Sequence, residues 1–285
     1  MRILVTGTSG QIGSVIASML SSEHTVLGID LIPGKQTTHK GDIANRDFIF
    51  SATQDIDAVI HTSSLHAPHL KEYPAESFVK TNIDGTRCLL EASIKNKVKR
   101  FVYTSTTSLY GHAMNPSDKA VWVTEDLVPE PRDIYDDTKI AAEDLCRSFS
   151  EKHGLPCISL RVSRFFPEPE YLMAIYRMYR GVDVRDAAEA HILAMEVDSK
   201  GYDVFNISAR SPFSEDETHE LLHDAPRVLL RHFPLLDKQY AQRSWKLPKS
   251  IDRVYVIHKA EKQLGYRPRY NFEDYLRELN ILPPQ

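Results

Sequence analysis

Tyr135 and Lys139 lie four residues apart, within the sequence YDDTK. On a helix this spacing places both side chains on one face. A phenol with a pKa of about 10 is a poor base at neutral pH, and a neighbouring cation favours its ionised form. The pair therefore indicates a tyrosine that removes a proton from an alcohol. The same spacing recurs at Tyr255 and Lys259, so the surrounding sequence must decide between the two pairs.

A glycine-rich loop, TGTSGQIG, follows a short apolar run at the start of the chain. Gly7 allows a tight turn out of a strand, Gly10 lets the backbone approach a pyrophosphate, and Gly13 lets the next helix pack closely on the sheet. Gln11 and Ile12 begin that helix, and a helix N-terminus favours bound phosphate. This order of elements predicts a dinucleotide site.

Asp30 ends the second predicted strand, at the spacing where a carboxylate accepts both ribose hydroxyls of an adenosine. A carboxylate in this place opposes the extra 2′-phosphate of NADP. The next residue is Leu31, where an arginine would be expected in an NADP site. The sequence therefore predicts NAD as the cofactor.

Strands and helices alternate along the chain to about residue 207, which predicts an α/β fold with a Rossmann-type, doubly wound parallel sheet. The predicted strands are 2–5, 25–29, 58–61, 100–104, 157–162 and 204–207. The predicted helices are 12–20, 46–53, 75–97, 135–153 and 185–198. From about Pro212 the predicted elements are shorter and separated by prolines. We therefore expect an NAD-binding catalytic domain at 1–211 and a small C-terminal lobe at 212–285.

The glycine loop, the acid and the Tyr–Lys pair together resemble the extended short-chain dehydrogenase/reductases, specifically the NAD-dependent epimerase/dehydratase family. Between the fourth strand and Tyr135, the sequence TSTTSLYG resembles the hydroxyl-rich turn of that family, which ends in Tyr-Gly. The resemblance implies that Thr106, Tyr135 and Lys139 are catalytic, and that Lys139 also holds the cofactor. Tyr255 and Lys259 follow no such turn, so we expect them to pack or to face solvent.

The same resemblance implies further cofactor contacts. Asp42 and Ile43 occupy the place of the acid and the apolar residue beside the adenine ring. Asp42 has the alternative role of capping the helix that follows. Thr62 and Ser63 come after the third predicted strand, where small residues run beneath the cofactor.

The segment after the fifth predicted strand departs from the nucleotide-sugar members of the family. Arg164 stands where those members have an asparagine, and the segment that follows is short, with Pro-Glu-Pro at 167–169. This compact form resembles the uronate-dehydrogenase-like members, which oxidise a free sugar acid. The implied substrate contacts are Ser105, Thr106, Tyr135 and Arg164.

These patterns predict an NAD-dependent oxidoreductase or epimerase that acts on a secondary hydroxyl of a sugar derivative, either a nucleotide sugar or a free sugar acid. A 4,6-dehydratase is disfavoured, because Thr107 and Ser108 replace the Asp-Glu pair that follows the catalytic threonine in those members. The alternative is a catalytically silent, NAD-binding regulatory protein.

Composition narrows the classes of partner. The net charge of −4, without a basic block, disfavours nucleic acid. No apolar run approaches the roughly 20 residues that span a bilayer, and no secretion signal is evident, so we expect a cytoplasmic protein without a membrane partner. The sequence HELLH at 219–223 matches a zinc motif, but no third ligand follows at the expected spacing, so no metal is expected.

The predicted helices 75–97 and 135–153 carry more apolar residues than one buried stripe requires. In the proteins that this chain resembles, these two helices pair across a two-fold axis. We therefore expect a homodimer through them. The alternative is a monomer in which the C-terminal lobe or a loop covers these helices.

Overall fold

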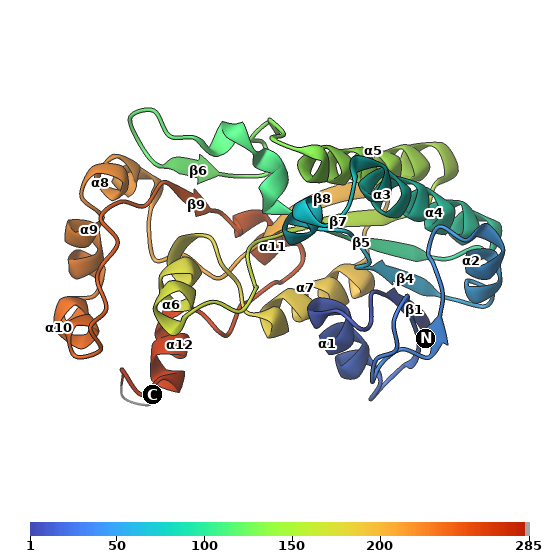
Figure 1. Cartoon of the computed structure of the whole chain (residues 1–285), viewed down its shortest axis with the longest axis horizontal. Helices are drawn as coiled ribbons and strands as arrows, with labels where there is room; N and C mark the ends of the chain where they lie inside the picture. The colour runs from blue at the N-terminus through green and yellow to red at the C-terminus, as the bar shows by residue number, and fades with distance from the viewer. Residues whose placement is uncertain (283–285) are drawn as a thin grey trace.

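The computed structural model describes residues 1–282, and a seven-stranded parallel sheet forms its centre (Figure 1). In spatial order the strands are β3 (His39–Lys40), β2 (Thr25–Asp30), β1 (Arg2–Thr6), β4 (Ala58–His61), β5 (Arg100–Thr106), β7 (Cys157–Val162) and β8 (Tyr202–Ile207). The order changes direction between β1 and β4, where the crevice of a doubly wound sheet forms. The predicted α/β fold is confirmed.

Helices cover both faces of this sheet (Figure 1). One face carries α1 (Gln11–Leu20), α7 (Val184–Glu196) and α11 (His258–Gln263), and the other carries α2 (Arg46–Ala52), α4 (Gly85–Lys95) and α5 (Ile134–His153). Within β1, Ile3 and Val5 pack into the first of these layers and Leu4 into the second. Burial on both faces explains why the strand is apolar throughout and does not alternate.

The single helix predicted at 75–97 is divided into three parts. These are α3 (Ala75–Phe78), a π-helical turn η2 (Val79–Asp84) and α4. In the π-helical turn, the amide of Asn82 accepts a hydrogen bond from the N–H of Leu65 (2.8 Å) and donates to its C=O (2.9 Å) and to Thr138 of α5 (3.0 Å). Turns of this kind often occur at functional sites. Here the turn ties the loop after β4 to the helix that carries the predicted catalytic pair.

A second lobe lies beside the carboxyl ends of the strands (Figure 1). It contains β6 (Val121–Val123), paired with β9 (Arg253–Tyr255), together with five helices. The helices are α6 (Glu170–Tyr179), α8 (Thr218–His223), α9 (Ala225–His232), α10 (Leu236–Ala241) and α12 (Phe272–Glu278). One apolar cluster joins these segments, whereas α11 returns to the core of the sheet. The lobe is thus built from three parts of the chain, unlike the contiguous division expected at residue 212.

The helices expected at a dimer interface bury most of their apolar side chains within their own subunit. Phe78, Leu89, Leu90 and Cys146 are buried, and Val79 is exposed. These helices expose less apolar surface than the sequence indicated. The homodimer stays a prediction.

Candidate active site

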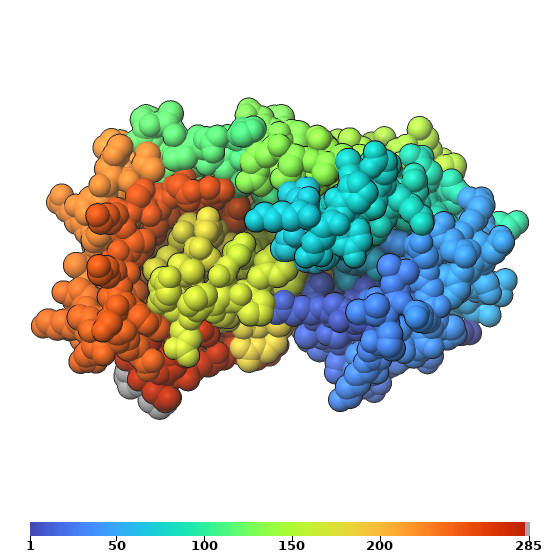
Figure 2. Space-filling view, in the orientation of Figure 1, coloured from blue at the N-terminus to red at the C-terminus, as the bar shows by residue number. Residues whose placement is uncertain are grey.

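A cavity of about 640 Å³ opens at the carboxyl ends of β1, β2, β4, β5 and β7, between the sheet and the second lobe. A notch separates the lobe from the N-terminal part of the chain in the space-filling view (Figure 2). The cavity brings together the glycine loop and the residues of the predicted catalytic turn. The crevice at the carboxyl ends of the strands is the usual ligand site of this architecture.

The glycine loop folds tightly against the loop after β4. Gly7 has a φ of +77°, and a Cβ there would lie 2.6 Å from the hydroxyl of Thr62 and 2.9 Å from the nitrogen of Ser63. A Cβ at Gly13 would lie 2.1 Å from the carbonyl oxygen of Gly7. The close approach at Gly13 is therefore to Gly7, directly after β1, and to Thr62, directly after β4, where a Cβ would lie 2.9 Å from the hydroxyl.

The N-terminus of α1 faces this cavity without a competing anion. Gly10 precedes the helix and provides no side-chain cap, and the first turn contains no acidic residue. Gln11 and Ile12 line the cavity. The free N–H groups of such a turn bind phosphate, so the site fits the pyrophosphate of a dinucleotide.

Asp30 is held in a fixed orientation at the end of β2. Its two carboxylate oxygens accept hydrogen bonds from the N–H groups of Ser9 (2.9 Å) and Ile32 (3.2 Å). Each oxygen keeps a further lone pair, and the residue lines the cavity. The carboxylate is thus placed to accept hydrogen bonds from ribose hydroxyls.

Asp42 and Ile43 also line the cavity. Asp42 accepts the N–H of Ala44 (2.9 Å) and lies 3.4 Å from the ammonium of Lys80. The residue that caps α2 is Asn45. Of the two roles that the sequence left open for Asp42, the structure excludes the helix cap.

The small residues after β4 are fixed against β1. Thr62 donates its hydroxyl hydrogen to the carbonyl of Thr6 (2.7 Å), and the N–H of Ser63 reaches the Thr6 hydroxyl (3.2 Å). His61 is fully buried between the hydroxyls of Thr6 and Thr86, and burial lowers its pKa to about 3. His61 is therefore a neutral packing residue.

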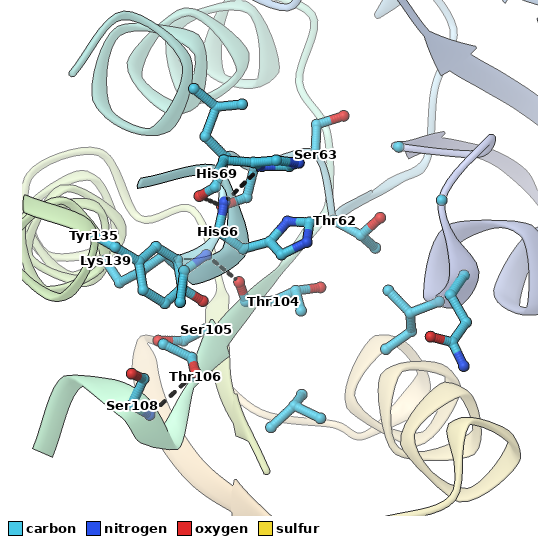
Figure 3. A pocket seen from close by; sticks show the side chains of 18 of the residues that line it. Thr62, Ser63, His66, His69, Thr104, Ser105, Thr106, Ser108, Tyr135 and Lys139 are labelled. Carbon is cyan, nitrogen blue, oxygen red and sulfur yellow. Dashed lines mark hydrogen bonds between the residues drawn. The ribbon is translucent and has the colours of Figure 1, made fainter. Parts of the chain in front are cut away.

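The three predicted catalytic residues meet at the end of β5 (Figure 3). Lys139 donates to the carbonyl of Thr104 (2.6 Å), which leaves two of its three N–H groups for a ligand. Thr106 accepts the N–H of Ser108 (3.1 Å), and its hydroxyl lies beside Tyr135 in the cavity. Tyr135 is buried beside them on the same face of α5 as Lys139.

Burial opposes the charged form of both members of the Tyr–Lys pair. Burial raises the pKa of Tyr135 to about 12, although hydrogen bonding to Thr106 acts to lower it. It lowers the pKa of Lys139 to about 7, and the carboxylate of Glu143 acts to raise it. The Lys139 ammonium also lies 4.3 Å from the centre of the Tyr103 ring, which favours its positive charge.

A buried polar network supports this site from behind. Ser105 donates to Glu143 (2.5 Å), Arg161 donates to Glu143 (2.8 Å) and to the hydroxyl of Tyr110 (3.0 Å), and Tyr110 donates to Asn206 (2.8 Å). The hydroxyl of Ser105 is therefore engaged inside the protein. Ser105 nevertheless lines the cavity, so its role as a substrate contact stays a prediction.

Arg164 lines the cavity, but its guanidinium is partly exposed and forms an ion pair with Glu168. The sequence pattern at 160–168 therefore identified a segment that lines the cavity, although Arg164 already has an acidic partner. Residues of the lining that sequence analysis did not identify include His66, His69, Arg132, Phe166, Arg180, Arg253 and Tyr255. Most of them come from loops or from the lobe, where no short motif marks a contact.

Two loops meet over the cavity. The ring of His66, after β4, stacks on that of Phe166, after β7, with centres 5.4 Å apart. The N–H of His66 donates to Nδ1 of His69 (3.2 Å), which fixes the turn (Figure 3). The side-chain amide of Gln11 donates to the carbonyl of Phe165 (3.3 Å). The segment after β7 is thus in direct contact with both the glycine loop and the loop after β4.

The second Tyr–Lys pair has a different arrangement. Lys259 forms an ion pair with Asp203 (2.5 Å) outside the cavity. Tyr255 is buried, and its hydroxyl donates to the sulfur of Met114 (3.3 Å). Tyr255 nevertheless lines the substrate side of the cavity, which the sequence did not indicate.

No group of three potential metal ligands occurs in the part of the chain that the structure describes. In the HELLH segment, Glu220 is bound to Arg227 and Arg231, and His223 contacts the carbonyl of Asp118 (3.0 Å). Within residues 1–282, no helix is long and apolar enough to cross a membrane.

Comparison with known proteins agrees with this geometry. The model of the NAD-dependent epimerase/dehydratase family matches residues 3–171. The chain belongs to this family. It is accordingly an NAD-dependent enzyme of the extended short-chain dehydrogenase/reductase type, with NAD as its cofactor, as the sequence predicted.

Individual relatives are distant but extend over the whole chain. The low-salt glycan biosynthesis protein Agl12 of Haloferax volcanii is 28% identical over 310 residues, 96% of each protein. A UDP-glucuronic acid 4-epimerase of Bacillus cereus, solved with UDP-glucuronic acid and NAD, is 25% identical with a TM-score of 0.70, over 98% of this chain and 100% of that one. A mutated uronate dehydrogenase, 19% identical, shares the fold with a TM-score of 0.70, over 100% of this chain and 87% of that one.

Proposed function

We propose that the protein oxidises a secondary hydroxyl of a sugar or sugar derivative, either as a dehydrogenase or as the first half of an epimerisation. The observation that carries this proposal is the convergence of Thr106, Tyr135 and Lys139 beside the glycine loop in one cavity. The UDP-glucuronic acid 4-epimerase of Bacillus cereus named above, solved with UDP-glucuronic acid and NAD, supports the substrate class.

Each of these residues has a distinct role in the proposed reaction. Thr106 donates a hydrogen bond that orients the substrate oxygen, and Tyr135 removes the proton of the hydroxyl. Lys139 favours the ionised form of Tyr135 by its charge and offers its remaining N–H groups to a ribose. Bound NAD supplies the hydride acceptor.

The experiment is a screen of the purified protein with NAD against free sugars, uronates and nucleotide sugars. Absorbance of the reduced cofactor reports net oxidation, and chromatography of the sugar reports epimerisation. Steady accumulation of reduced cofactor identifies a dehydrogenase, whereas conversion of the sugar without accumulation identifies an epimerase. Binding of NAD without turnover of any sugar in the panel would favour the regulatory alternative.

A further inference from the structure

Four arginines line the cavity, and they differ in how their charge is balanced. They are Arg132, Arg164, Arg180 and Arg253. The first, second and fourth form ion pairs with Asp136, Glu168 and Asp252, respectively. Arg180 has no ion pair and no side-chain hydrogen bond within residues 1–282. Among these four arginines, it is the one without an acidic partner in the described part of the chain.

The surroundings of Arg180 explain how its positive charge is stabilised without an acidic partner. Its guanidinium carbon lies 4.2 Å from the ring centre of Tyr176 and 5.6 Å from that of Tyr179. These aromatic faces attract a cation, but they offer no hydrogen-bond acceptor in the plane of the guanidinium. The Nε atom of Arg180 is buried and has no partner. A buried polar atom without a partner is costly, so this side chain is set for a ligand.

The backbone fixes Arg180 close to the reacting groups. Thr106 is paired with Val162 across β5 and β7. Two residues further along, the N–H of Arg164 donates to the carbonyl of Arg180 (3.3 Å), and Gly181 forms a bridge with Arg164. Arg180 therefore stands at the carboxyl end of the strand beside the catalytic threonine, on the substrate side of the cavity.

A second guanidinium approaches the same place from β9. Arg253 donates to the sulfur of Met114 (3.3 Å) and to Asp252, and its Nε atom is also buried without a partner. The charges of both Arg180 and Arg253 act on the buried hydroxyl of Tyr179, so the two side chains share one neighbourhood. Two planar guanidinium groups with free donors match an oxyanion.

We propose that Arg180, assisted by Arg253, binds an oxyanion carried on the sugar itself, a carboxylate or a monophosphate, and thereby determines the substrate. The cavity volume agrees with a compact ligand. About 640 Å³ lies within the range of a site for one drug-sized molecule, and the substrate would have to share this volume with the cofactor. This inference rests on the proposed function, since it assigns the substrate of the same site.

The test is titration calorimetry of the NAD-loaded protein with D-glucuronate, D-glucose 6-phosphate, D-glucose and UDP-glucose. We expect at least one of the two small anions to bind the wild type, and Arg180→Gln to weaken that binding about 10- to 100-fold. We expect the anion affinity of Arg180→Lys to lie between those of the wild type and Arg180→Gln, because lysine keeps the charge and loses the planar pair of donors. Binding of NAD is expected to be unchanged in both variants, which shows that they are folded.

Arg227→Gln is the matched control, because Arg227 is exposed on α9 and its replacement by glutamine also removes one positive charge. The proposal is overturned if neither small anion binds the wild type, if Arg180→Gln changes their affinity less than twofold, or if the loss is confined to UDP-glucose. Reduction of NAD by members of the same panel is scored separately. Failure of that reaction counts against the proposed function and leaves the outcome of the titration to decide the role of Arg180.

Discussion

The cofactor side and the substrate side of the cavity differ in how their polar groups are satisfied. On the cofactor side, the carboxylate of Asp30 is held by the N–H groups of Ser9 and Ile32. On the substrate side, Arg180 and Arg253 each keep a buried Nε without a partner. The contacts of Asp30 lie within one stretch of chain, residues 9–32, whereas the two arginines have donors without a partner in the described structure. The difference separates recognition of a common cofactor from recognition of a particular substrate.

The largest effect is expected where the two sides meet. Tyr135→Phe removes the proton acceptor and leaves the ring in place, so turnover should fall by about two to four orders of magnitude while NAD binding persists. Steady-state kinetics and NAD titration of the same preparation measure both quantities. If turnover stays within tenfold of the wild type, the assignment of Tyr135 as the base is wrong.

Substitution of Asp30 tests whether the cofactor side binds NAD through this carboxylate. Asp30→Asn removes the charge that accepts ribose hydroxyls, so the affinity for NAD should fall about 10- to 100-fold. Wild-type protein should bind NAD more tightly than NADP, since a charge about 4 Å from an added phosphate opposes it by roughly 4 kcal/mol. Fluorescence titration with both reduced cofactors measures the ratio. Equal affinity of the wild type for the two would remove Asp30 from the ribose site.

Lys139 belongs to both sides, and its burial predicts a dependence of stability on pH. Its pKa is about 7 in the folded protein, against about 10.4 for an unfolded lysine. Between these values the unfolded chain binds more protons, so stability rises with pH from about 7 to 10. Lys139→Met removes this dependence. The NAD-free variant should therefore gain stability, by about 2–3 kcal/mol more at pH 6 than at pH 9.

Urea denaturation at the two pH values measures that gain. Lys259→Met is the control, because Lys259 is partly exposed and paired with Asp203. A gain in the Lys139→Met protein that does not change between pH 6 and pH 9 would show that the lysine keeps an ordinary pKa when folded.

The smallest effects are expected on the substrate wall of the lobe. Tyr255→Phe loses one hydrogen bond to the sulfur of Met114 and keeps the ring, so KM should change a few-fold and kcat little. Lys259→Met should leave both constants within about twofold, since it lies outside the cavity. Kinetics with the best substrate of the panel measure these values. A loss at Tyr255 that exceeds the loss at Tyr135 would mean that the wrong pair was assigned to catalysis.

The same contrast explains what the sequence could predict. The glycine loop, Asp30 and the Tyr–Lys pair belong to local patterns in which steric need or helical spacing dictates the residue type. Their strands and helices were predicted within a few residues, and the cavity contains all of them. The break at 79–84 was not predicted, because the extra residue of that turn serves contacts with Leu65 and Thr138, which are distant in sequence.

The substrate side was not predictable in this way. Arg180 and Arg253 are brought together by the pairing of β6 with β9 and by the packing of α6 in the lobe, and no motif surrounds either residue. Local pattern also did not reveal that the hydroxyl of Ser105 donates to Glu143 of α5. Positions that depend on contacts between distant segments require the folded structure.

The pairing of β6 with β9 also has a consequence for the order of events during synthesis. Residues 121–123 find their partner only at residues 253–255, near the end of the chain. Such distant contacts form late, because closing the long intervening loop costs entropy before any contact repays it. During translation the strands and glycine loop of the N-terminal half emerge first. A nascent chain can therefore assemble the glycine loop and its strands before the pairing of β6 with β9 completes the second lobe.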